Sequence, residues 1–185
     1  MHEAAERALR HTDLVGEERV STRKQSFSGG LPAKQVMPEL QSRQVAQQVS
    51  GSFHWPIRVY YEDTDGGGVV YHANYLKFME RARTEWLRSL GFEQTELRTK
   101  FGVLFVVRRL KLQYLRPACF NDSLSVITQL VKTGRSLLEF QQTIQRNDEM
   151  LTEATVEVVC VDADQFKPVS IPALIHNTMK MMEPQ

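Results

Sequence analysis

The chain of 185 residues lacks several features that mark specialised classes of protein. It has only two cysteines, without metal-like spacing, and no apolar run near the roughly 20 residues needed to cross a bilayer. It also has no charge excess, because 23 basic side chains face 22 acidic ones. These absences argue against a disulfide-rich scaffold, a transmembrane helix and a protein that holds nucleic acid through charge. We expect a cytoplasmic, reducing setting.

Aromatic residues are nearly absent from the first 50 positions, where Phe27 is the only one. Aromatic side chains carry much of the area that a core can bury. We therefore expect residues 1–50 to form a disordered extension, residues 53–172 to form the folded domain, and residues 173–185 to form a C-terminal tail. The extension has neither the apolar stretch of a secretory signal nor the acid-poor composition of a transit peptide.

The sequence of the folded part predicts one strand, then one long helix and then four further strands. Residues 74–90 place apolar side chains at three- and four-residue spacing and end at Gly91, which is typical of an amphipathic helix. Alternating or β-branched patterns predict the strands, at 57–61, 104–114, 124–131, 138–145 and 154–160. Short turns between the later strands indicate antiparallel pairing. We predict an α+β fold in which the helix lies across a curved five-stranded antiparallel sheet, in the order β-α-β-β-β-β.

The densest group of reactive side chains lies at residues 61–75, between the first strand and the helix. Carboxylates and a histidine flank three glycines ahead of a helix start, whose free N–H groups suit an oxyanion. An aspartate here could act as general base or nucleophile. As a calcium loop the spacing fails, because Gly67 and Asn74 occupy ligand positions. Composition alone also allows a solvated loop with a structural histidine.

The run Arg58–Tyr75, RVYYEDTDGGGVVYHANY, continued by LKFMERARTEWLR, resembles the YbgC-type acyl-CoA thioesterases. These are Tol–Pal-associated relatives of the 4-hydroxybenzoyl-CoA thioesterases and have the hotdog fold. The resemblance spans residues 53–172 and implies a thioester hydrolase that releases free acid and coenzyme A. It implies no metal and no separate cofactor, because coenzyme A is part of the substrate.

The resemblance also implies roles for particular residues. The essential carboxylate falls on Asp65, and the N–H that polarises the thioester carbonyl falls on His72. Tyr61 and the His72 side chain match positions near the reacting centre. Glu62 and Asp63 are expected to be solvated or to structure the loop. Gly66 stands where many relatives carry alanine, a departure that should alter loop flexibility more than chemistry.

The last expectations concern the binding site for coenzyme A and the oligomeric state. Arg135 and Ser136 match positions that often contact the nucleotide phosphates, although a solvated turn explains them equally well. Arg108 interrupts an apolar face, which favours a structural pairing. A domain of ~120 residues covers its sheet poorly, so we expect a homodimer or homotetramer. The resemblance implies that the active site lies at the dimer interface. The alternative is a non-catalytic hotdog module that binds acyl-CoA, acyl carrier protein or a Tol–Pal envelope complex.

Overall fold

The computed structural model describes residues 47–49 and 51–184. Apart from its last few residues, the expected extension 1–50 therefore lies outside the described part of the chain. The helices and strands, in chain order, are β1 (Gln47–Val49), β2 (Ser52–Arg58), η1 (Tyr61–Asp63), α2 (Asn74–Ser89), α3 (Gln94–Phe101), β3 (Val103–Tyr114), β4 (Ser123–Thr133), β5 (Leu137–Arg146), β6 (Glu149–Asp162) and α4 (Ala173–Lys180).

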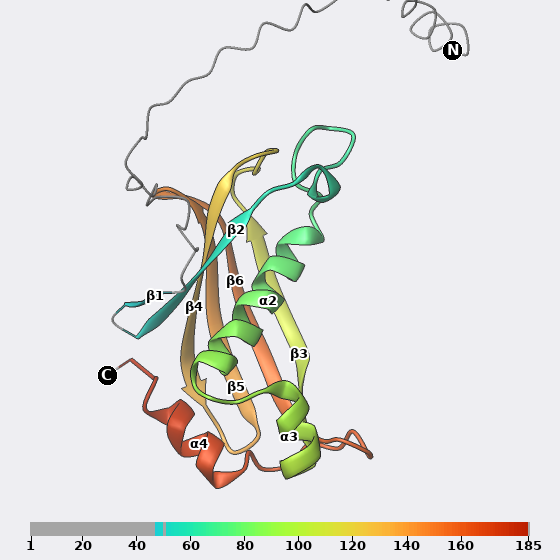
Figure 1. The fold of residues 1–185 in the computed structure, drawn as a ribbon, viewed down its shortest axis with the longest axis vertical. Helices are drawn as coiled ribbons and strands as arrows, with labels where there is room; N and C mark the ends of the chain where they lie inside the picture. Colours follow the sequence, from blue (N-terminus) through green and yellow to red (C-terminus); the bar gives the residue numbers. More distant parts are fainter. Residues whose placement is uncertain (1–46, 50, 185) are drawn as a thin grey trace, which may run out of the picture. The chain divides into compact units, whose positions relative to one another are not determined.

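The strands form one six-stranded antiparallel sheet in the order β1-β2-β4-β5-β6-β3. Helix α2 crosses one face of this sheet (Figure 1). The predicted α+β class, the long helix and the antiparallel sheet are confirmed. The structure adds the short strand β1, the 3-10 turn η1 and the helices α3 and α4.

Two predicted boundaries differ from the structure. The first strand ends at Arg58 rather than residue 61, because Val59 exchanges hydrogen bonds with Asp122 and Asn121 and the chain then turns into η1. The segment set apart as a C-terminal tail contains α4, in which Ile175 and Met179 are fully buried.

The apolar face of α2 forms the centre of the core. Phe78, Met79 and Ala82 have no exposed surface, and Trp86 packs edge to face on Phe140 of β5. Burying a large apolar side chain stabilises a fold by about 1.5–3 kcal/mol. This face therefore fixes the rotation of α2 on the sheet and, with it, the direction in which the start of the helix points.

A polar contact fixes the position of α2 along the sheet. The amide of Gln142, fully buried in β5, donates to the Met79 carbonyl of α2 at 3.0 Å and to the Thr128 hydroxyl of β4 at 2.8 Å. Its carbonyl oxygen accepts from Arg83 at 2.6 Å, and burial lowers the pKa of that guanidinium. Because each polar group in this cluster around Gln142 has a partner, a slip of the helix would leave several of them unsatisfied.

Arg108 interrupts the alternation of β3 because it is the extra residue of a bulge. The register with β6 shifts between Val107 and Arg109. Arg108 lies 3.9 Å from Glu157 of β6, as the expected structural pairing requires. Beyond β3 no further strand pairs within the described residues, so this strand forms an open edge of the sheet.

Candidate active site

The loop between β2 and α2 is held by Asp63. Its carboxylate accepts the Tyr60 N–H at 2.9 Å, and its carbonyl accepts the Tyr71 N–H at 2.8 Å and the Asn74 side-chain amide at 2.9 Å. Asp63 is buried, as is Asn74. Of the two roles expected for Asp63, loop-structuring is therefore the one that the structure shows.

Asp65 is exposed at the tip of this loop. Its backbone N–H binds the Val69 carbonyl at 2.9 Å, and its Oδ1 accepts the Gly67 N–H at 2.8 Å. A Cβ atom at Gly67 would lie 3.1 Å from that same oxygen, while Gly68 has a φ of 76°. Two of the three glycines thus have defined roles: one lies against the carboxylate and the other makes the left-handed turn.

The start of α2 presents a free N–H group. The Tyr71 carbonyl accepts the Asn74 N–H at 2.8 Å, and the Tyr114 hydroxyl donates to the His72 carbonyl at 2.8 Å. Among the described residues, no hydrogen bond is made by the N–H of His72. An unpaired N–H at a helix start adds to the partial positive charge there and favours a developing negative charge.

A cavity of ≈ 260 Å³ opens beside this helix start. Its lining residues are Val70, His72, Tyr75, Tyr114, Leu115, Arg116 and Pro117. Asp65 does not line the cavity, but it lies at the other end of the short loop 66–71 from His72. Mostly apolar walls with a few polar groups are typical of a small-molecule site.

Tyr61 does not line this cavity. Its side chain is 76% exposed and its ring stacks on Phe120 with centroids 3.8 Å apart. The His72 side chain is also exposed, with its ring 4.3 Å from that of Tyr71. The four aromatic side chains therefore form two ring contacts, Tyr61 with Phe120 and Tyr71 with His72.

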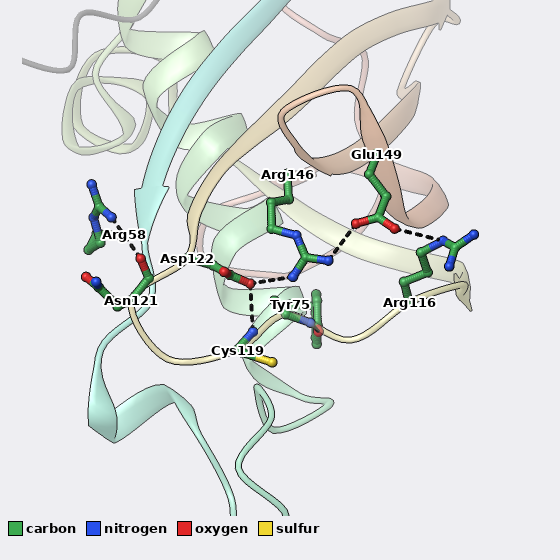
Figure 2. A network of polar contacts seen from close by, with 9 residues as sticks. Arg58, Tyr75, Arg116, Cys119, Asn121, Asp122, Arg146 and Glu149 are labelled. Carbon is green, nitrogen blue, oxygen red and sulfur yellow. Dashed lines mark hydrogen bonds and ion pairs between the residues drawn. The ribbon is translucent and has the colours of Figure 1, made fainter.

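A chain of ion pairs supports the other side of the site (Figure 2). The Asp122 carboxylate accepts the Cys119 N–H and a guanidinium N–H of Arg146, each at 2.8 Å. Arg146 also binds Glu149 at 2.5 Å, and Glu149 in turn lies 3.1 Å from Arg116 on the cavity wall. Both carboxylates raise the pKa of Arg146. Sequence reasoning missed this network, because it joins residues 116–122 to residues 146–149, two stretches separated in the chain, and no member interrupts a pattern.

Arg135 and Ser136 lie in the turn between β4 and β5. The Arg135 side chain donates to the Ser170 hydroxyl at 2.7 Å, and the Ser136 carbonyl accepts the Cys160 N–H at 2.8 Å. This turn lies at the opposite end of the sheet from the loop at the start of α2 (Figure 1). The 11 residues of β4 alone span ~36 Å at about 3.3 Å each. Within one chain, the structure does not bring these residues to the cavity.

The cysteines and the remaining surface add little chemistry. Cys160 is buried, and burial raises the pKa of its thiol to about 11, whereas Cys119 is exposed. Across the described residues, no three His, Cys, Asp or Glu side chains form a metal-binding group. In the same part of the chain, no helix is long and apolar enough to cross a membrane.

Comparison with known proteins defines the class and then the family. Residues 67–153 match the model of the thioesterase superfamily, and the fold is that superfamily's hotdog fold. YbgC acyl-CoA thioesterase of Haemophilus influenzae is 48% identical over 124 residues, 67% of this chain and 91% of that protein. Its Helicobacter pylori namesake is 34% identical over 126 residues, 63% of this chain and 92% of that protein. A probable thioesterase from Bartonella henselae superposes with a TM-score of 0.61 at 36% identity, covering 64% of this chain and 98% of that one. The chain therefore belongs to the YbgC family of acyl-CoA thioesterases.

Proposed function

We propose that the protein hydrolyses the thioester of an acyl-coenzyme A, with the His72 N–H as the oxyanion donor and Asp65 as general base or nucleophile. The observation that carries this proposal is the free N–H of His72, a residue that lines the cavity. Asp65, held by Gly67 at the other end of the same loop, supplies a carboxylate without a cationic partner among the described ion pairs.

The His72 N–H acts on the thioester carbonyl. As the carbonyl carbon is attacked, its oxygen gains negative charge, and the donor binds the charged oxygen more strongly than the neutral one. Loss of one such donor typically costs about 100–1,000-fold in rate. The partial positive charge at the start of α2 acts in the same direction.

Asp65 has two chemically balanced routes. As a base it takes a proton from water while the water oxygen attacks the carbonyl carbon; the carbon–sulfur bond breaks, and the coenzyme A thiolate takes that proton. As a nucleophile its oxygen attacks instead, the carbon–sulfur bond breaks and coenzyme A leaves as its thiolate. Water then hydrolyses the mixed anhydride to the free acid and the Asp65 carboxylate, and the proton released goes to the thiolate. In both routes one carboxylate oxygen stays on the Gly67 N–H and the other acts. Tyr61 and the His72 side chain are proposed to border the reacting centre.

We propose that the active enzyme is a homodimer or homotetramer. The open edge of β3 and the exposed apolar side chains on and just after this strand, among them Val107 and Leu115, support this proposal. If Arg135 and Ser136 hold the phosphates of coenzyme A, they do so for the active site of a second copy of the chain. The cavity of their own chain is lined by residues at the start of α2, at the opposite end of the sheet (Figure 1). Two free cysteines agree with the proposed cytoplasmic setting.

Thiol release from a panel of acyl-CoA substrates tests the function directly. The proposal predicts turnover of at least one member, with saturation kinetics. Tight binding of the panel without release of thiol would instead favour the non-catalytic module, with acyl carrier protein or a Tol–Pal component as its partner. An Arg135→Ala variant should raise KM for acyl-CoA but leave KM for the matching acyl-pantetheine, which lacks the nucleotide, unchanged. Equal changes in KM for both substrates would contradict a contact between Arg135 and the phosphates.

A further inference from the structure

We infer that Tyr114 is a positioning residue for the oxyanion donor, because its hydroxyl anchors the peptide group next to the one that carries the His72 N–H. The inference rests on the proposed function. Tyr114 belongs to the edge strand β3, and the sequence pattern identifies it only as one residue of an alternating strand; the inference gives it a positioning role in catalysis.

Three successive peptide groups show why an anchor is needed here. The first, between Val70 and Tyr71, is held because the Tyr71 N–H binds the Asp63 carbonyl at 2.8 Å. The second, between Tyr71 and His72, carries the free N–H, and its carbonyl accepts from Asn74 at 2.8 Å. The third, between His72 and Ala73, is held by the Tyr114 hydroxyl, which donates to the His72 carbonyl at 2.8 Å. The donor peptide is thus fixed from both sides.

Tyr114 is the one of these anchors that comes from outside the loop and helix. It is the last residue of β3, where it pairs with Thr152 of β6, and its ring meets Tyr75 edge to face at 5.5 Å. The Tyr75 hydroxyl in turn accepts the Ala118 N–H at 2.8 Å. Partial burial raises the pKa of Tyr114 above its ordinary 10, so the hydroxyl remains a donor at neutral pH.

Removal of this hydroxyl should change orientation more than binding. Without it, the His72 carbonyl binds water, and the peptide at the helix start gains freedom to rotate. A donor that points away from the oxyanion loses strength in the transition state, while contacts to the rest of the substrate persist. The expected signature is therefore a lower kcat with an unchanged KM.

The first test is Tyr114→Phe, which keeps the ring on the cavity wall. We expect kcat to fall about tenfold, less than complete loss of an oxyanion donor, with KM within about twofold. Tyr60→Phe is the matched control, since its side chain is 61% exposed and its hydroxyl makes no hydrogen bond within the described residues; it should leave both constants unchanged. A kcat within twofold of wild type would overturn the inference, as would a raised KM at constant kcat.

Hydrogen–deuterium exchange gives a second readout that does not depend on activity. In Tyr114→Phe, amides of residues 70–76 should exchange about tenfold faster, whereas those of β5 should not change. Unchanged exchange at 70–76 would contradict the anchor even if kcat fell. Asp65→Asn should lose activity while keeping wild-type exchange there. If Asp65→Asn stayed active, the proposed chemistry would fail, and the exchange result would still decide the role of Tyr114.

Discussion

Replacing Gly67 by alanine should lower activity without lowering stability. The new Cβ would lie 3.1 Å from Oδ1 of Asp65, so the carboxylate must retreat by about 0.3–0.5 Å to reach an ordinary contact. A 1 Å misplacement of a reacting group can cost about 100-fold in rate; if the cost scales with displacement, this retreat costs about four- to tenfold. Gly67 does not have a positive φ, so alanine should stabilise the fold by up to about 1 kcal/mol through the unfolded chain.

The neighbouring glycines supply matched controls. A Cβ at Gly66 meets nothing within 4 Å, and its φ is not positive, so Gly66→Ala should keep activity within about twofold. Gly68 has a φ of 76°, and Gly68→Ala should instead lower the free energy of unfolding by about 1–2 kcal/mol. Three adjacent substitutions of the same kind therefore have three different expected outcomes.

The assay pairs initial rates of thiol release with thermal unfolding of each variant. We expect Gly67→Ala alone to lower activity without lowering stability, with a lower kcat and an unchanged or higher Tm. If Gly66→Ala and Gly67→Ala lose activity equally, the contact with Asp65 does not matter. If Gly67→Ala is as active as wild type, either the carboxylate does not need this position or Asp65 is not the reacting group.

The remaining predictions concern the core and the thiols. Gln142→Leu should lower the free energy of unfolding, measured by denaturant titration, by about 2–4 kcal/mol, because it leaves the partly buried Arg83 guanidinium without its acceptor. Gln141→Leu, on the other face of β5, should cost less than about 1 kcal/mol in the same titration. At pH 8 a disulfide reagent should modify exposed Cys119 rapidly and spare Cys160, whose raised pKa of about 11 keeps it protonated. Both thiols should react once the chain is unfolded. Rapid modification of both thiols in the folded protein would contradict the burial of Cys160.

The parts of the fold that follow a local period could be predicted from the sequence. The apolar stripe of α2 repeats every three or four residues, and the strands alternate, so both stand out without tertiary information. Even the one break in the alternation, at Arg108, corresponds to a real bulge in β3. The short helix α4 was missed because eight residues show too few repeats to stand apart from an irregular tail.

The site residues likewise fall into those that could be predicted from a local pattern and those that could not. The loop with Asp65 and His72 is contiguous in sequence, so its residue types and its place before a helix could be recognised together. The contact between Tyr114 and His72 joins residues 42 positions apart, and Arg116 reaches the cavity only through the turn after β3. Such pairs leave no local pattern. The distance of Arg135 from the cavity likewise depends on the length and direction of β4, which a turn motif does not report.

The rate of thioester hydrolysis by Asp65→Asn tests the central claim most directly. The substitution keeps the size of the side chain and an oxygen that can accept the Gly67 N–H, but removes the charge needed for base or nucleophile. We predict a loss of at least about 1,000-fold in kcat with an unchanged Tm, while Glu62→Gln, on an exposed side chain of the same loop, stays fully active. An Asp65→Asn enzyme that retains most of its activity would contradict the account.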